Sequence, residues 1–184
     1  IDHGAIPEGC EAEFISLNGD CKEVALWHGA LRSDSNLRAT VLPSGQSMAA
    51  RADVDSSEVT PVRAYIIEPD AAVIRAHLVA QLAEDLDTSQ IDDQVAYLTT
   101  DALRPTPFGK YFSVTDVFPF GIRRLREYVA HHGIGTLDIK RRRFPMEPGE
   151  VRRQLKLKGS KRKTFILTRF GDDPIAIFCD PVRP

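Results

Sequence analysis

Hydrophobic and polar residues alternate along the start of the chain in the manner of half-buried strands. Residues 11–17 lead into Asn18-Gly19, a pair that accepts positive φ and favours a two-residue hairpin turn, and residues 21–27 form the expected return strand. A third short strand is predicted at 38–42, after a polar connection. The pattern therefore predicts a small group of antiparallel strands within residues 1–43.

A stretch without periodicity separates these strands from the next group. Residues 44–61 are small and polar, which is typical of a linker. Structure is expected to resume with a strand at 62–67, followed by a helix that begins at Pro69-Asp70, because proline is tolerated in the first turn and aspartate suits the positive end of the helix dipole. Further strands are predicted at 95–99 and 111–118. The expected apolar face of the helix consists of Val73, Ile74, His77, Leu78 and Leu82.

The last third of the chain alternates helices and strands. A helix with apolar residues at helical spacing is predicted to end at Gly133, because glycine readily adopts the left-handed conformation that closes a helix. A strand at 137–142, a helix opened by Pro148, and a closing hairpin of residues 164–170 and 175–178 are expected to follow. This order predicts an α+β fold in which helices lie on one face of a small sheet.

The distribution of charge divides the chain into two parts. Through residue 120 there are 8 Lys and Arg against 19 Asp and Glu, a net charge of −11. From residue 121 there are 16 against 7, a net charge of +9. Such an asymmetry gives the molecule a directional field, and the basic part is a candidate for contacting a polyanion.

Composition excludes several classes of protein. The chain is 42% hydrophobic and 27% charged, as in ordinary globular domains, and no apolar run approaches the roughly 18 residues of a membrane-spanning helix, so no membrane partner is expected. Cys10, Cys21 and Cys179 are too few for a disulfide framework and form no C-x-x-C pair, so no metal site is predicted. Reduced thiols and a cytoplasmic location are expected, although Cys10 and Cys21 could face each other across the predicted hairpin.

The basic part carries three clusters of cations on consecutive predicted elements. The first ends the strand at 137–142, the second lies on the following helix, and the third occupies a Gly/Ser-containing loop that runs into the next strand. We expect the clusters to converge on one face or rim that contacts phosphates, the alternative being a charged surface that only faces solvent. The predicted nucleic-acid-binding residues are Lys140, Arg141, Arg142, Arg143, Arg152, Arg153, Lys156, Lys158, Lys161, Arg162 and Lys163.

The chain shows no visible catalytic constellation. A nucleotide or S-adenosylmethionine site on a doubly wound fold needs a glycine-rich turn after the first strand, and the close pair Gly133-x-Gly135 instead follows a predicted helix and precedes a strand. Glu68 and Asp101 could be acids of an independently active enzyme, but helix-start and turn roles explain such residues first. The sequence therefore predicts no catalytic, cofactor-binding or metal-binding residue in this chain.

Several segments carry a resemblance to a known family. Taken together they resemble the ferredoxin-like middle region and the THUMP-like C-terminus of bacterial class I S-adenosylmethionine-dependent methyltransferases, and residues 11–27 and 38–42 resemble the final antiparallel strands of the methyltransferase domain. Phe144-Pro145-Met146 departs from the pattern, because the family usually has a glycine after the basic run. The segments that carry the resemblance between residues 62 and 180 are Ala64–Ala76, Ala96–Asp101, Thr106–Phe108, Leu137–Arg142, Glu147–Gly159 and Phe165–Arg169.

The resemblance implies a division of the chain and a role for it. Residues 1–43 would be C-terminal strands of a truncated methyltransferase domain, 44–61 a linker, 62–118 a ferredoxin-like domain and 119–184 a THUMP-like domain. The parent protein would be an enzyme that methylates RNA with S-adenosylmethionine, whose cofactor turn and catalytic residues lie upstream. This chain would dock structured RNA, such as tRNA or rRNA, for that upstream domain, and would not transfer methyl groups alone.

A protein-interaction or dimerisation module is the rival hypothesis. In that reading the acidic front part of one chain pairs with the basic tail of another, and no nucleic acid is involved. The two hypotheses differ in what reversal of the basic charges does, because only the rival predicts a change in oligomeric mass.

Overall fold

Two β-sheets and four short α-helices make up the computed structural model of the protein, which describes residues 3–54 and 56–182. The first sheet contains β1 (Glu11–Leu17), β2 (Asp20–Trp27), β3 (Leu37–Leu42) and β4 (Gln46–Ala49). The second contains β5 (Tyr65–Pro69), β6 (Ser89–Asp92), β7 (Val95–Thr100), β8 (Gly109–Pro119), β9 (Ile134–Arg141), β10 (Lys161–Phe170) and β11 (Asp173–Pro181). The helices are α1 (Ala71–Arg75), α2 (Val79–Leu86), α3 (Ile122–His131) and α4 (Pro148–Leu155), with 3₁₀ turns at His3–Ala5 and Gly29–Leu31.

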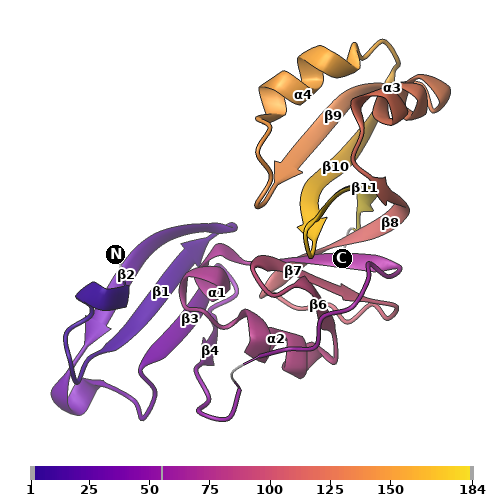
Figure 1. The fold of residues 1–184 in the computed structure, drawn as a ribbon. Coiled ribbons are helices and arrows are strands. Elements are labelled where there is room, and N and C mark those ends of the chain that lie inside the picture. The colour runs from indigo at the N-terminus through magenta and orange to yellow at the C-terminus, as the bar shows by residue number, and fades with distance from the viewer. Residues whose placement is uncertain (1–2, 55, 183–184) are drawn as a thin grey trace.

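The strand orders are β2-β1-β3-β4 in the first sheet and β6-β7-β5-β8-β11-β10-β9 in the second (Figure 1). Mixed sheets with a few short helices constitute the α+β class that the sequence predicts. None of the helices in the described residues has the length and apolar character of a membrane-spanning segment; the longest, α3, has 10 residues.

The first sheet is built on the predicted hairpin. Asn18 (φ 56°) and Gly19 (φ 94°) form the turn between β1 and β2, as the sequence predicts. The third strand, β3, pairs with β1 in parallel, so the prediction of antiparallel strands was wrong for this strand and the first sheet is mixed. Ala12 and Phe14 are buried on the face that packs on α1.

Part of the segment predicted to be a linker is a strand. Residues 46–49 form β4, which pairs antiparallel with β3. The turn is closed by Gly45, which has a positive φ and donates its N–H to the carbonyl oxygen of Val41, and Met48 is buried between exposed neighbours. A four-residue strand with one apolar residue has too weak an alternation to be recognised in sequence.

A buried carboxylate joins the first sheet to its connecting loop. Glu11 is 1% exposed at its side chain and accepts hydrogen bonds from the Ser33 backbone N–H and the Arg38 Nε, both at 2.7 Å. Burial opposes ionisation, but the hydrogen bonds from Ser33 and the charge of Arg38 outweigh it and lower the pKa of Glu11.

The helix predicted after Asp70 is interrupted. Asp70 caps α1 by accepting the Ala72 N–H at 2.9 Å, as expected for an aspartate at a helix start. The helix then ends in a Schellman arrangement, with His77 at φ 58° and the Leu78 N–H bonded to the Val73 carbonyl oxygen at 3.0 Å. The prediction of one continuous helix was therefore wrong, because the apolar spacing continues through a turn that realigns the chain for α2.

The second sheet is continuous because β8 pairs along both of its edges. Residues 109–113 pair with β5, and residues 112–119 pair with β11. β8 thus belongs at once to the predicted unit 62–118 and to the strands of the following unit. At one edge of this sheet the short strand β6 pairs with β7. The sequence predicted no element in this segment.

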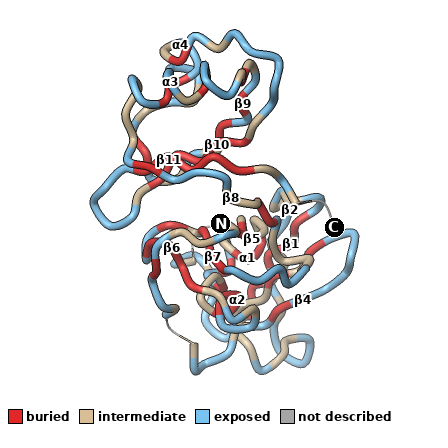
Figure 2. The backbone as a smooth tube through the Cα atoms, turned by 90° about the vertical axis from the view of Figure 1, so that its right-hand side faces the viewer, coloured by how far each residue is buried: buried red, intermediate tan, exposed pale blue. Residues whose placement is uncertain are grey.

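The core of the C-terminal part lies beneath two helices. α3 and α4 cover one face of β9, β10 and β11 (Figure 1), and buried residues follow β10 and β11 while loops are exposed (Figure 2). The helix predicted to close at Gly133 does so, with Gly133 at φ 66°. The apolar residues that the periodicity placed on the two helices and that are buried here are Leu125, Val129, Val151 and Leu155.

A close backbone crossing fixes the loop after α4. A Cβ added at Gly135 would lie 1.7 Å from the Gly159 carbonyl oxygen, and one added at Gly159 would lie 1.9 Å from the Gly133 carbonyl oxygen. Only glycine fits at such a crossing, so these residues bring the loop before β10 onto the end of α3.

Gly159→Ala is expected to lower the free energy of unfolding by about 2–3 kcal/mol, because its methyl group overlaps backbone atoms that cannot move cheaply. Gly149→Ala, in α4 with nothing within 4 Å of the new methyl group, serves as the control and should be neutral or stabilising by up to about 1 kcal/mol. Urea unfolding followed by circular dichroism measures both; equal midpoints would show that the crossing is looser than described.

Candidate nucleic-acid interface

The strand topology divides the eleven predicted nucleic-acid-binding residues between two ends of the second sheet. β9 and β10 are parallel, with Ile134 beside Lys161 and Arg141 beside Leu167. From Ile134 to Lys140 the strand rises by roughly 20 Å at about 3.3 Å per residue. The cluster that ends β9 and the cluster that begins β10 therefore lie far apart, and the structure does not bring the three clusters to one place.

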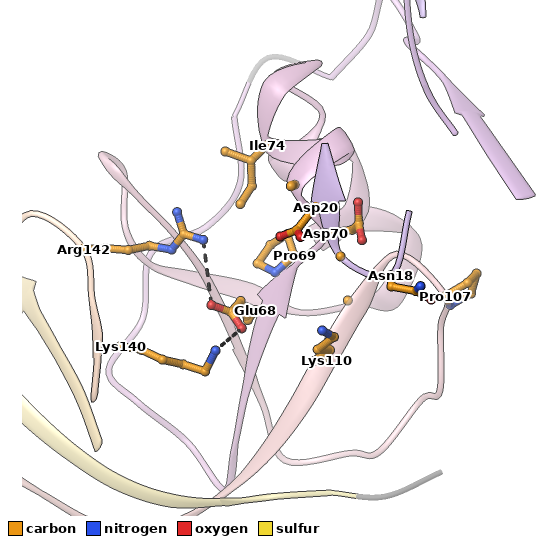
Figure 3. Close-up of a pocket in the computed structure, with 13 residues that line it drawn as sticks. Asn18, Asp20, Glu68, Pro69, Asp70, Ile74, Pro107, Lys110, Lys140 and Arg142 are labelled. Atoms are coloured by element: carbon orange, nitrogen blue, oxygen red, sulfur yellow. Dashed lines mark hydrogen bonds and ion pairs between the residues drawn. The ribbon is translucent and has the colours of Figure 1, made fainter. Parts of the chain in front are cut away.

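The cations that end β9 face carboxylates of the middle strands. Lys140 Nζ lies 2.7 Å from Glu68, Arg142 lies 3.9 Å from the same carboxylate, and Arg143 lies 3.4 Å from Asp92 (Figure 3 shows the first two contacts). Glu68 is 19% exposed and Asp92 2%. We call Lys140, Arg142 and Arg143 the junction cations, because their ion pairs connect the end of β9 to β5 and β6.

Aromatic rings also hold two of the junction cations. The Lys140 ammonium lies 5.3 Å from the centre of the Phe112 ring, and the Arg142 guanidinium lies 5.1 Å from that of Tyr97. Tyr97 is buried, and its burial, with a smaller contribution from Glu68, raises the pKa of its hydroxyl. Lys140 and Arg142 are thus fixed against a neutral ring and a carboxylate, and much of their charge is already compensated.

Three further predicted residues make contacts within the C-terminal part. Arg141 pairs with Glu147 at 2.7 Å, and Lys163 pairs with Asp180 at 2.5 Å. Arg152 donates to the carbonyl oxygen of Leu137 at 3.0 Å and 3.3 Å. These side chains stabilise the unit and offer less free charge to a ligand than their sequence pattern indicates.

The remaining five predicted residues are exposed, four of them at the other end of the sheet and Arg153 on α4. None of them has a carboxylate within 4.0 Å among the residues that the structure describes. The Gly159 crossing holds the loop after α4 against the end of α3. Lys156 and Lys158 precede this crossing in the loop, and Lys161 and Arg162 begin β10. We call these five residues the rim cations: Arg153, Lys156, Lys158, Lys161 and Arg162.

Two pockets flank the rim cations and meet at Ile134. One, of about 360 Å³, is lined by Arg126, Lys156 and Lys158. The other, of about 500 Å³, is lined by Lys161, Arg162 and Lys163 together with Asp116 and Asp180. The concave surface places several cations within reach of one ligand, and cations are the groups that neutralise phosphates.

An aromatic stack forms the wall of the larger pocket. The His132 ring stacks on Tyr128 with their centres 4.2 Å apart, and the Tyr128 hydroxyl donates to Asp116 at 2.6 Å. Burial, followed by the hydrogen bond to Asp116 and its negative charge, raises the pKa of Tyr128, so the hydroxyl stays protonated at neutral pH. His132 follows the last turn of α3 and is exposed there.

Two cations near these sites, Arg126 and Lys110, are not among the residues predicted from the sequence. Arg126 lines the smaller pocket and donates to the Gln154 carbonyl oxygen at 2.6 Å, while Lys110 begins β8 close to the junction cations. Each stands apart from the basic runs, and only the pairing of distant elements places it beside them. A local pattern of residues contains no signal for either position.

A family model for a THUMP-like domain matches residues 109–181. This match contains β8 to β11, α3 and α4, together with all the rim cations and junction cations. Residues 109–181 are therefore similar to a THUMP-like domain, as the sequence resemblance implies.

The chain is similar to proteins described as methyltransferases. It is 34% identical over 178 residues to an uncharacterized S-adenosylmethionine-dependent methyltransferase found in two strains of Mycobacterium tuberculosis, with 94% of this chain and 49% of the relative covered. A crystal structure of a "putative methyltransferase" from Porphyromonas gingivalis matches with a TM-score of 0.78 and 17% identity, covering 95% of this chain and 46% of that one. The chain thus spans about half the length of the relatives it matches. The comparisons are consistent with the resemblance to the C-terminal region of such a protein, and the solved structure supports the fold.

Glu68→Gln is expected to lower the free energy of unfolding by about 1–2 kcal/mol, because Lys140 and Arg142 lose a partly buried counter-charge. Glu147→Gln removes the 68% exposed partner of Arg141 and should cost less than about 0.5 kcal/mol. Urea unfolding of both variants tests this difference; an equal effect would mean that the junction pairs do not hold β9 in place.

Proposed function

We propose that this chain is the RNA-docking region of an S-adenosylmethionine-dependent RNA methyltransferase. The observation that carries the proposal is the set of rim cations, which are exposed and without carboxylate partners among the described residues, with four of the five at one end of the second sheet. In this role they neutralise backbone phosphates of a structured RNA such as tRNA or rRNA.

The comparisons support the proposal in its broad terms. The THUMP-like match contains the rim cations, and the relatives of this chain are named as S-adenosylmethionine-dependent methyltransferases. Methyl transfer would be carried out with S-adenosylmethionine by a methyltransferase domain upstream, to which residues 1–43 would contribute the last strands. The proposal assigns 62–118 to a ferredoxin-like domain, 119–184 to the RNA-docking domain, and the whole protein to the cytoplasm.

Ion pairs with carboxylates determine which of the predicted residues are free to act in docking. The junction cations and Arg141 and Lys163 already pair with carboxylates, so an RNA phosphate would have to compete for them. The rim cations have no such competitor among the described residues, and each phosphate they contact releases about one counterion. Docking through the rim therefore predicts a strong dependence of affinity on salt concentration.

Reversing rim charges should abolish docking. The triple variant Lys158→Glu, Lys161→Glu, Arg162→Glu is expected to weaken binding to a folded tRNA or a structured rRNA fragment at least about thirtyfold, and to make the plot of log affinity against log salt less steep by roughly 3. Fluorescence anisotropy at several salt concentrations measures both quantities.

A matched variant controls for net charge. Arg75→Glu, Arg104→Glu, Arg123→Glu changes the charge by the same amount at exposed positions away from the rim, and should leave the slope within experimental error. An equal loss in the two triple variants would contradict docking at the rim. Light scattering on the same samples tests the rival hypothesis, because a dimer that breaks in the rim variant while no RNA binds would identify a protein-interaction module.

A further inference from the structure

A polar pocket of about 280 Å³ opens where the first sheet meets the second (Figure 3). Its walls come from the β1–β2 turn, the end of β5 with the start of α1, the start of β8, and the end of β9. Three cations from two of these regions line it: Lys110 from β8, and Lys140 and Arg142 from the end of β9. The pocket lies at the end of the sheet opposite the rim cations.

The charges in this pocket are not balanced. Lys140 and Arg142 share the one carboxylate of Glu68, at 2.7 Å and 3.9 Å. Lys110 has no carboxylate partner or hydrogen-bond acceptor among the described residues that line the pocket. Asp20 is paired with Lys22 at 3.1 Å, and Asp70 keeps its charge while it accepts the Ala72 N–H. With Lys22 counted, four cations face three carboxylates, so a net charge of +1 remains.

The Lys110 side chain lies against the β1–β2 turn and forms no ion pair with Glu68 among the described residues. Glu68 lies directly opposite Lys110 in the register of β5 and β8. Lys110 Nζ nevertheless lies against the β1–β2 turn, 2.9 Å from the position that a Cβ on Gly19 would occupy. Gly19 thus leaves room for the ammonium group of Lys110 beside the turn of the first sheet.

Arg142 offers a second donor that is only weakly paired. Its Nη2 lies 3.9 Å from Glu68, beyond hydrogen-bonding distance, and its side chain is 31% exposed. The guanidinium is held over the Tyr97 ring at 5.1 Å. A ligand that accepts hydrogen bonds from Lys110 and Arg142 would therefore meet donors whose positions are already restricted.

We propose that this pocket binds a phosphate group of the RNA backbone. The inference rests on the proposed function and extends it to a second contact point. An oxyanion satisfies ammonium and guanidinium donors together. The described residues that line the pocket include no aromatic side chain, so a base has no ring on which to stack.

The two contact points define how the RNA lies. The rim cations hold phosphates at the start of β10, and the pocket holds one phosphate roughly 20 Å away, beyond the end of β9, by the rise of that strand. The pocket phosphate lies next to the β1–β2 turn and therefore next to the first sheet. Contacts at both ends favour an RNA with a defined three-dimensional shape over a short flexible strand.

The first test uses inorganic phosphate as the probe in the full chain. Titration at constant ionic strength, followed by nuclear magnetic resonance of the backbone amides, should shift Asn18, Gly19 and Lys110 to saturation. Lys110→Gln should weaken this phosphate binding at least about fivefold, because it removes a charge-assisted hydrogen bond. Glu68→Gln should strengthen it, since the competing carboxylate is lost, and Arg75→Gln, an exposed cation on α1, should leave it unchanged.

The second test uses folded RNA. Lys110→Gln should weaken RNA binding severalfold and make the salt dependence less steep by about 1, on top of the effect of the rim variant. A turn that shows no saturable shift, or a Lys110→Gln variant that binds phosphate and RNA as the wild type does, overturns the pocket proposal alone. A chain that binds phosphate at this turn but no RNA refutes the proposed function and, with it, RNA as the source of the phosphate.

Discussion

The structure depends on β8 serving two neighbours. One half of this strand pairs with β5 and the other half with β11, so strands that the sequence assigns to two domains form one seven-stranded sheet. The sheet curves enough for Ile166 of β10 to join the same apolar cluster as Ile91 of β6. A shared strand couples the two units through backbone hydrogen bonds, which leave less freedom than a flexible linker would.

This coupling determines which carboxylates the basic residues at the end of β9 contact. It brings the end of β9 over Glu68 and Asp92, where Lys140 and Arg143 find carboxylates. The acidic front part and the basic tail of the sequence therefore partly neutralise each other within one molecule. Formal charge along the chain overstates the charge available to a ligand, because paired cations must be separated from their partners before they can contact a phosphate.

Within the part of the chain that the structure describes, unpaired cations gather in two places with different character. The rim is open, rich in cations and flanked by concave surface, so it suits several phosphates of a large polyanion. The pocket beside the β1–β2 turn is small and combines one free ammonium with two cations that share a carboxylate. Under the proposed function, the two features together would hold an RNA in a fixed orientation, as presenting one of its positions to a catalytic domain requires.

The sequence by itself determined the features that depend on neighbouring residues. The Asn18-Gly19 turn, the cap at Asp70, the end of α3 at Gly133 and the buried faces of α3 and α4 were all predictable, because φ preferences and helical spacing act within a few residues. The tertiary structure decided the break at His77, the pairing of β8 with two strands and the choice of free cations. Lys140 and Glu68 are 72 residues apart, and no local pattern records which carboxylate a cation meets once the sheet closes.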